Sequence, residues 1–354
     1  MELALYDPEV GYYARAAQRS GRAGDFFTSV DVGPLFGELL EVQLAEMASI
    51  LYSQFPIPDF DLVEAGAGNG RLTADILRAA RRRDPWLYER ARVHLVEASP
   101  AARAAQLHTL GEMSDRLAAS SEQLPERVEG VLIANELLDA LPVHQVVMRD
   151  GALREVYVDA DLRATEGPLS TPALSAYLDR LGITLEDGWR VEINLRAVEW
   201  IKEAANRLAR GFMVLFDYGH HARELYSASH SSGTLTTFSG HTMGGPESAV
   251  PWLADPGERD ITAHVDFTSV RAAAEAAGLT TIGLLDQTYF LLGIVSALEA
   301  AAQEGRAPAL SLSKGALRTL VMPGSLGSTH KVLILGKGVG APSLIGCSFK
   351  IRMT

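Results

Sequence analysis

The residues with the clearest chemical character follow a short apolar run, residues 60–63, that predicts a buried strand. Glu64 comes next, then Gly66, Gly68 and Gly70 at every second position, and a helical pattern begins directly afterwards. Glycines let the backbone adopt positive φ and let a ligand lie against the main chain, and a helix N-terminus favours anionic groups. The stretch therefore predicts a nucleotide-type cradle.

The spacing of these glycines excludes the common dinucleotide fingerprint. That fingerprint needs a glycine at position 71 when it starts at Gly66, and the sequence has Arg71 there. The pattern Glu64-x-Gly66-x-Gly68-x-Gly70 instead resembles motif I of the S-adenosylmethionine-dependent methyltransferases. An ordinary glycine-rich turn between a strand and a helix is the alternative.

An acidic residue stands at the end of the second predicted strand. Residues 92–97 predict a strand that ends in Glu97, 27 residues after Gly70. In nucleotide-binding α/β folds an acid at this position accepts hydrogen bonds from ribose hydroxyls. We therefore predict a ribose contact for Glu97, with a surface acid at the start of the next helix as the alternative.

Three further polar groups follow the third predicted strand, residues 130–134. Asn135, Glu136 and Asp139 lie in one short segment directly after it. The carboxyl ends of parallel strands face the crevice where α/β proteins bind ligands, so these side chains are the best chemical candidates in the chain. A helix-capping Asn followed by acids in the first helical turn would also be physically satisfactory.

These groups come together only if the strands form a parallel sheet. Buried strands are expected at 212–216 and 330–335, and Asp150-Gly151 predicts a hairpin. Asn194 is expected to cap a helix that ends at Gly211, and Thr268 is expected to cap a helix that ends at Gly278. The alternation of strands and helices predicts an α/β fold, mainly parallel and covered by helices on both faces.

Composition narrows the class of protein. The 354 residues carry a net charge of −12, which argues against general affinity for nucleic acid or anionic membranes. The lone Cys347 excludes an internal disulfide and a cysteine-based zinc site, and no apolar run is long enough for a membrane span. With no signal or transit peptide at the start, a cytoplasmic protein is expected.

Histidines cluster in residues 220–262, which are rich in Ser, Thr, Gly and Pro and predict a long loop. His220, His221, His230 and His241 match no metal-ligand spacing, so no metal is predicted. His264 follows this loop and is a candidate to orient an acceptor or take its proton, although a lone histidine is more often structural.

Several segments, taken together, resemble the MidA family, methyltransferases that in mitochondria act as complex I assembly factors. The matching pieces are Gly11-Tyr12-Tyr13, Gly24-Asp25-Phe26-Phe27-Thr28-Ser29, Leu35-Phe36-Gly37-Glu38-Leu39, the glycine loop, Asn135 to Pro142, Asp217-Tyr218-Gly219, Gly233-Thr234-Leu235, Asp260 to Phe267 and the last strand. They occur in the family's order over roughly residues 6–338. One departure is Val30-Asp31, where the family usually has a Pro-Glu pair.

The resemblance implies a seven-stranded Rossmann-like methyltransferase sheet with its final strand antiparallel, and S-adenosyl-L-methionine as cofactor. It also implies, for the mitochondrial members, an arginine of a respiratory-complex subunit as acceptor. Glu64, Gly66, Gly68, Gly70, Glu97, Asn135, Asp25 and Thr28 are then the expected cofactor contacts, and Glu136, Asp139 and His264 the expected catalytic groups. Glu136 and Asp139 would bind a guanidinium through paired carboxylates.

One methyltransferase domain is expected over residues 1–354. Its predicted parts are an N-terminal helical segment with a lid (1–55), a cofactor-binding half (56–142), a hairpin and helix insertion (143–192), a second half (193–340) and a tail of unclear structure (341–354). Two alternatives stay open: a methyltransferase acting on another protein side chain or a small molecule, and a non-catalytic assembly factor that binds the cofactor or only its partner.

Overall fold

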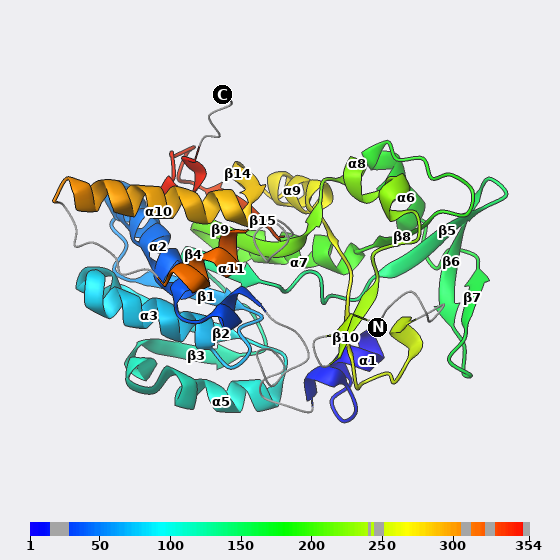
Figure 1. Cartoon of the computed structure of the whole chain (residues 1–354), viewed down its shortest axis with the longest axis horizontal. Helices are drawn as coiled ribbons and strands as arrows, with labels where there is room; N and C mark the ends of the chain where they lie inside the picture. Colours follow the sequence, from blue (N-terminus) through cyan, green and yellow to red (C-terminus); the bar gives the residue numbers. More distant parts are fainter. Residues whose placement is uncertain (15–27, 240–241, 244–250, 306–312, 323–329, 350–354) are drawn as a thin grey trace.

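The structure is a computed structural model that describes residues 1–14, 28–239, 242–243, 251–305, 313–322 and 330–349 (Figure 1). Asp25 and His241 lie outside the described residues, as do residues 323–327, whose Pro323-Gly324 pair predicts a turn before the last strand. Within these ranges, no helix has the length and apolar character needed to cross a bilayer.

A large central sheet organises the molecule. Its strands are β1 (Phe60–Ala65), β2 (Ala91–Val96), β3 (Leu117–Ser121), β4 (Val128–Asn135), β9 (Leu208–His220), β14 (Thr280–Asp286) and β15 (His330–Lys337), in the spatial order β14-β15-β9-β4-β1-β2-β3. Neighbours from β9 to β3 pair in parallel, whereas β15 is antiparallel to both β9 and β14. The predicted α/β fold with an antiparallel final strand is confirmed, and the short β13 (Val265–Asp266) adds an eighth strand beside β9.

Alternating side chains of these strands enter two cores, one on each face of the sheet. In β9, Phe212, Val214 and Phe216 pack into the first core, and Met213 and Leu215 pack into the second. Strands covered on both faces read as continuous apolar runs, which is why the strands were visible in the sequence.

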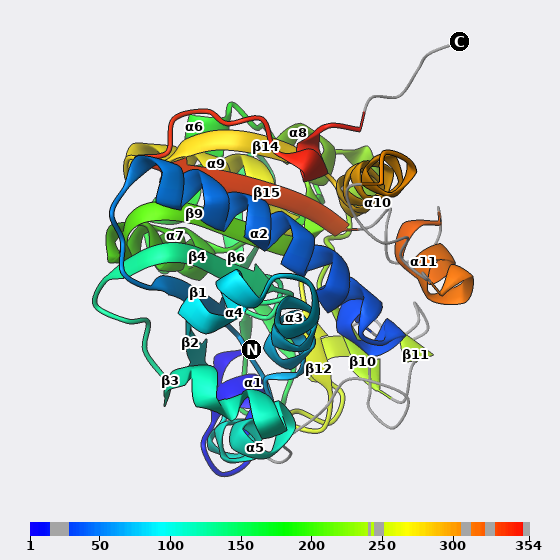
Figure 2. The ribbon, with the colours of Figure 1, turned by 90° about the vertical axis from the view of Figure 1, so that its left-hand side faces the viewer.

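Helices cover both faces (Figure 2). The first core contains side chains of α2 (Leu35–Gln54), α3 (Arg71–Arg83), α4 (Pro85–Arg90), α5 (Pro100–Leu110), η3 (Gly111–Arg116), α10 (Gln287–Gln303) and α11 (Lys314–Val321). The second contains those of α7 (Leu195–Arg207) and α9 (Phe267–Ala276). Pro34 precedes α2, and α2 runs along the sheet beside β4 and β9.

A separate four-stranded sheet follows β4 in the chain and lies at the right of Figure 1. Its order is β7 (Ala164–Gly167), β6 (Ala152–Val158), β5 (His144–Arg149) and β8 (Arg190–Ile193), with α6 (Ala173–Leu181) packed on it. Asp150 and Gly151 both have positive φ, +50° and +77°, as the predicted two-residue hairpin turn requires. The division of the chain into domain, insertion and tail stays a prediction.

The N-terminal segment packs on a small three-stranded sheet. Helix α1 (Glu2–Tyr6) and η1 (Tyr12–Ala14) form a core with β12 (Asp260–Thr262), which pairs with β10 (Thr236–Ser239), itself paired with β11 (Thr242–Met243). The remaining short helices are η2 (Ser29–Val32), α8 (Ala222–Leu225), η4 (Ala228–His230), η5 (Pro251–Leu253) and η6 (Ile345–Cys347). Part of the stretch predicted as a long loop is therefore regular structure.

Two predicted helix limits were wrong. Helix α7 ends at Arg207, not Gly211, because β9 already begins at Leu208. Helix α9 is capped by Asp266, whose carboxylate accepts hydrogen bonds from the backbone N–H groups of Thr268 and Ser269, so Thr268 is inside the helix. In the tail, Gly346 N–H donates to Gln43 of α2 at 2.9 Å.

The centre of the sheet depends on a close backbone approach at Gly130. A Cβ atom there would lie 2.1 Å from the carbonyl oxygen of Asp61 on β1. We expect Gly130→Ala to lower the free energy of unfolding by about 3 kcal/mol, because neither strand can move without breaking the sheet. Gly315→Ala, in α11 with nothing within 4 Å, should be neutral or stabilising. Urea unfolding of both variants checks this, and equal stabilities would contradict it.

Candidate active site

A cavity of about 330 Å³ lies at the carboxyl ends of β1, β2 and β4. This volume is in the range of small-molecule and cofactor sites. Of the residues predicted to act, its lining includes Thr28, Glu64, Gly66, Gly68, Glu97, Asn135 and Glu136. Gly70, Asp139 and His264 do not line it, and Asp25 is not described.

The glycine loop leaves its main chain open to the cavity. Gly68 has φ +53°, and a Cβ atom there would meet nothing within 4 Å. Gly70 also has positive φ, +83°, but its Cβ would lie 3.0 Å from Leu95. Gly68 thus admits a ligand, whereas Gly70 allows the turn to enter α3.

Glu97 is tied to the glycine loop by its carboxylate. One oxygen accepts a hydrogen bond from Gly68 N–H at 2.8 Å, and the other accepts one from Ser99 N–H at 2.8 Å. Gln106 donates to the Gly68 carbonyl at 2.8 Å. Since a carboxylate has about four acceptor positions, Glu97 retains capacity for ligand hydroxyls.

Glu64 joins the end of β1 to the first turn of α3. Its buried carboxylate accepts hydrogen bonds from the backbone N–H of Thr73, at 3.2 Å, and from the Thr73 hydroxyl. Burial raises the pKa of Glu64 to about 7. An acid with that pKa at the cavity wall is further ionised by a bound cation.

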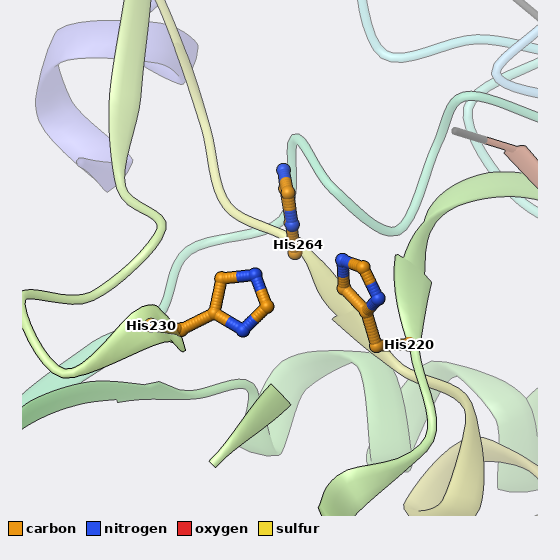
Figure 3. A group of neighbouring side chains, drawn as sticks. All are labelled: His220, His230 and His264. Atoms are coloured by element: carbon orange, nitrogen blue, oxygen red, sulfur yellow. The ribbon is translucent and has the colours of Figure 1, made fainter. Parts of the chain in front are cut away.

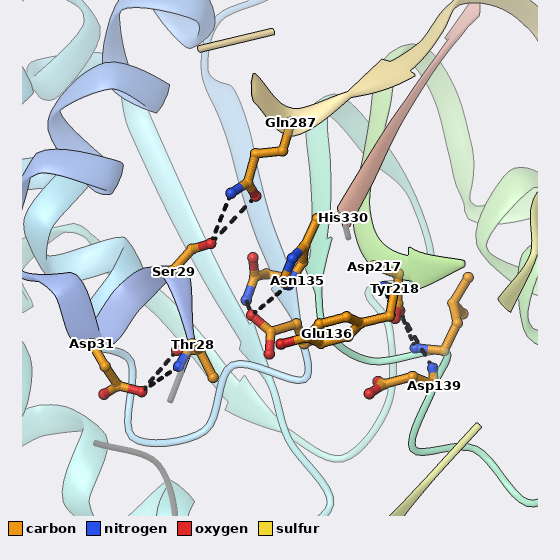
Figure 4. Close-up of polar contacts among 11 residues, drawn as sticks. Thr28, Ser29, Asp31, Asn135, Glu136, Asp139, Asp217, Tyr218, Gln287 and His330 are labelled. Carbon is orange, nitrogen blue, oxygen red and sulfur yellow. Dashed lines mark hydrogen bonds and ion pairs between the residues drawn. The ribbon is translucent and has the colours of Figure 1, made fainter. Parts of the chain in front are cut away.

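Arg71, the residue that excludes a dinucleotide fingerprint, has a structural partner. Its guanidinium forms an ion pair with Asp31, and the same carboxylate accepts hydrogen bonds from the backbone N–H and hydroxyl of Thr28, both at 2.9 Å. Asp31 belongs to the Val30-Asp31 pair, which stands where the MidA family usually has a Pro-Glu pair. The segment at 28–32, part of the N-terminal region 1–55 in which a lid was expected, is thereby fastened to the start of α3. Figure 4 shows the contact between Thr28 and Asp31.

Glu136 is held over the cavity in a strained turn. It has φ +51°, which is uncommon outside glycine and recurs at functional sites. Its N–H donates to the Phe216 carbonyl at 2.8 Å, and its carboxylate lies 3.4 Å from His330 Nε2 and accepts from the Asn135 amide at 3.4 Å. The Glu136 side chain is 10% exposed and His330 is fully buried (Figure 4).

Asp139 does not stand beside Glu136 in the cavity lining. It is buried, and burial together with the charge of Asp217 raises its pKa well above the usual range. Its Oδ1 has no hydrogen-bond partner among the described residues. Asp217, at the end of β9, accepts hydrogen bonds from the N–H groups of Leu138 and Asp139 at 2.8 and 3.4 Å. The structure therefore does not present the predicted pair of carboxylates to one ligand.

His264 joins a different group of side chains. Its ring lies 5.2 Å from that of His220 and 6.1 Å from that of His230, centroid to centroid. Burial lowers the pKa of His264 to about 4. His220 and His230 are 10 residues apart along the chain, and His230 and His264 are 34 apart. These spacings match no local pattern, so the cluster could not be predicted from the sequence.

The sequence also gave no indication that N-terminal aromatic residues line the cavity. Tyr6 and Tyr13 do so, with ring centroids 5.4 Å apart. The Tyr6 hydroxyl donates to the Ala140 carbonyl at 3.0 Å, and that of Tyr13 to Asp260 at 2.8 Å. Trp200 of α7 is a third aromatic lining residue.

Comparison with known proteins identifies the family. Residues 39–285 match the model of a family described as S-adenosyl-L-methionine-dependent methyltransferases. The chain belongs to this methyltransferase family. This confirms the class of enzyme expected from the resemblance.

Individual relatives agree with this assignment. The methyltransferase is 29% identical to the mitochondrial protein arginine methyltransferase NDUFAF7 homolog of Drosophila melanogaster, over 97% of this chain and 82% of the relative. It is 32% and 30% identical to mitochondrial NDUFAF7 of Mus musculus and Homo sapiens, each over 82% of this chain and 68% of the relative. A Burkholderia thailandensis protein crystallised with S-adenosyl-homocysteine has 29% identity and a TM-score of 0.83, covering 98% of this chain and 88% of that one.

These relatives contradict one prediction from the sequence. The methyltransferase was expected to be cytoplasmic, and the relatives from fly, mouse and human are all named mitochondrial proteins. The prediction of a cytoplasmic location was therefore wrong.

The cofactor of this methyltransferase is S-adenosylmethionine, and the cavity fits it. Gly68 opens main chain to the cavity, and two carboxylates, Glu64 and Glu97, line the same wall. S-adenosylmethionine carries an ammonium, a sulfonium and ribose hydroxyls, which are groups that carboxylates bind.

A side chain at Gly68 should obstruct the cofactor. We expect Gly68→Ala to weaken S-adenosylmethionine binding by about 10-fold or more, because the added Cβ would enter the cavity. Gly182→Ala is the matched control, since Gly182 has φ +63°, has nothing within 4 Å and does not line the cavity. Calorimetry on both variants measures this, and equal affinities would show that the cofactor does not approach Gly68.

The raised pKa of Glu64 predicts a pH-dependent stability. The unfolded acid titrates near 4.5 and the folded one near 7, so the unfolded state loses its proton first and stability falls as pH rises between these values. A glutamine at position 64 does not titrate, so the Glu64→Gln variant does not lose this stability as the pH rises. The unfolding free energy of the variant minus that of the unchanged protein should therefore rise by about 2–3 kcal/mol from pH 5 to pH 8.

Urea unfolding of both proteins at the two pH values isolates this effect from the other buried acids. A Glu64→Gln difference that is the same at both pH values would contradict the prediction.

Proposed function

We propose that this methyltransferase transfers a methyl group to an arginine side chain of a protein. The observation that carries the proposal is the carboxylate of Glu136, held in the cavity lining beside the glycine loop by a strained turn. The names of the relatives, protein arginine methyltransferases, support the choice of arginine.

Bound S-adenosylmethionine supplies a methyl group on a positively charged sulfur, so the protein's task is to position the acceptor and exclude water. On the cofactor side we assign the ribose hydroxyls to Glu97 and the close main-chain approach to Gly66 and Gly68. Glu64 anchors the loop and offsets the positive charge of the ammonium. Asn135 and Thr28 line the same cavity and are proposed as further contacts; Asp25 keeps this role as a sequence-based proposal.

On the acceptor side, Glu136 binds the guanidinium through charge-assisted hydrogen bonds and turns one nitrogen toward the methyl group. When the new C–N bond forms and the C–S bond breaks, that nitrogen loses a proton, and the same carboxylate is placed to receive it. His330, 3.4 Å from the Glu136 carboxylate, is a positioning residue for it. Asp139 and His264 lie outside the cavity lining, so they have no direct part in this scheme.

We further propose that the acceptor protein is a subunit of a respiratory complex I-type assembly. The resemblance to the assembly-factor family supports this choice. Comparing arginine methylation of respiratory-complex subunits by mass spectrometry, in cells with and without the gene, tests it. No lost methylation would favour the alternatives, another acceptor or a cofactor-binding assembly factor without catalysis.

Replacing Glu136 separates acceptor binding from cofactor binding. Glu136→Gln keeps the shape of the side chain but removes its charge, so we expect transfer to an arginine substrate to fall by about 100-fold or more. The calorimetric affinity for S-adenosylmethionine should change little, because the assigned cofactor contacts lie on β1, β2 and the glycine loop.

Glu129→Gln is the matched control. It removes the same charge from the opposite end of β4, where Glu129 pairs with Arg127 and Arg210, and should leave transfer unchanged. Parallel loss of transfer and cofactor affinity in Glu136→Gln would mean that Glu136 contacts the cofactor or only maintains the turn.

A further inference from the structure

Three histidines far apart in sequence meet beside the end of β9. His220 is the last residue of β9, His230 ends η4, and His264 lies between β12 and β13 (Figure 3). One potential ligand atom from each lies within 4.8 Å of the other two. Figure 3 shows the three rings facing a common space, each contributed by a different segment.

The hydrogen bonding of these rings is incomplete. Nδ1 of His264 is buried and has no hydrogen-bond partner among the described residues. A buried polar nitrogen without a partner is costly and needs an explanation. Nδ1 of His220 lies 3.0 Å from the Glu224 carboxylate, and Nδ1 of His230 lies 3.0 Å from the Glu224 carbonyl oxygen. An unpaired buried imidazole nitrogen that faces two further histidines is an arrangement that a metal ion satisfies.

We propose that His220, His230 and His264 bind one divalent transition-metal ion of the zinc class. Imidazole nitrogen is a ligand for zinc, copper, nickel and iron, and three histidines with one open position form a recognised zinc arrangement. The ligand set contains no thiolate, and oxygen-preferring ions such as magnesium and calcium are disfavoured by it.

The geometry requires a small adjustment. Nitrogens about 2.1 Å from a tetrahedral ion lie roughly 3.4 Å apart, and the separations here extend to 4.8 Å. Metal binding therefore requires the three side chains to rotate toward one another. The Glu224 carboxylate lies 3.0 Å from His220 Nδ1, where it either orients that ring or completes the coordination.

The ion joins three segments in addition to the existing pairing of β9 with β13. It links the end of β9 to η4 and to the connection between β12 and β13, across a span from residue 220 to residue 264. The site lies outside the cavity lining and is independent of the proposed methyl transfer. Its effect is therefore on the stability of this region.

Metal binding by the full-length, untagged protein tests the proposal. After removal of metal with a chelator, zinc would be titrated against a chromophoric competitor. We expect one ion per chain with a dissociation constant below about 1 μM. Cobalt substituted for zinc should give the visible absorption of a tetrahedral nitrogen site, and zinc should raise the melting temperature.

Variants assign the site to these residues. His230→Gln and His264→Gln should each weaken zinc binding by about 100-fold or more and abolish the shift in melting temperature. His221→Gln is the control, because His221 is adjacent in sequence, exposed and outside the cluster. Circular dichroism shows whether each variant is folded.

Three outcomes would overturn the proposal. The unchanged protein could fail to bind zinc in a one-to-one ratio, or its cobalt complex could lack the tetrahedral absorption. Alternatively, His221→Gln could weaken binding as much as His264→Gln. The first two outcomes are measured on the unchanged protein, so they remain decisive even if a variant does not fold.

Discussion

The parallel pairing of β1 with β4 and of β4 with β9 is the constraint on which the site depends. Ala65 is level with Ala134, and Asn135 is level with Phe216, so the polar residues that follow these strands emerge at one edge. The pairing is tight because Gly130 faces Asp61 on one side and Gly211 on the other, with no space for side chains. The same backbone contact therefore sets both the stability of the sheet and the spacing of the chemical groups.

Carboxyl groups are crowded at this edge. Burial raises the pKa values of Glu64, Asp139 and Asp217, and the charge of Glu136 adds to the effect on both aspartates. A site that accumulates acids at such a cost is suited to positive ligands, whose charge offsets the repulsion. S-adenosylmethionine is one such ligand, and the proposed arginine acceptor is a second. Two cations repel each other when brought together, and surrounding carboxylates reduce that repulsion.

Local patterns predicted much of this site, and long-range contacts account for what they missed. Glu64, the glycines and Glu97 were recognisable because each stands at the end of a buried strand or directly after it. The pairing of Arg71 with Asp31 joins residues 40 apart, and nothing near either residue indicates it. The position of Asp139 was missed for a local reason. In a helix it would share a face with Glu136 three residues earlier, but the positive φ of Glu136 prevents a helix, and Asp139 is buried outside the cavity lining.

Strand β9 connects the active site to the histidine cluster. The sequence predicted only residues 212–216, because the polar residues that follow do not look like a strand, yet β9 continues to His220 by pairing with β13. That pairing requires Gly219, where a Cβ would lie 2.1 Å from the Val265 carbonyl oxygen. Asp217, which holds the turn after Glu136, is thus three residues from His220 on one continuous strand. The pairing of Asp217 with Lys331 on β15 and of His220 with Asp266 on β13 therefore positions both groups on the same strand.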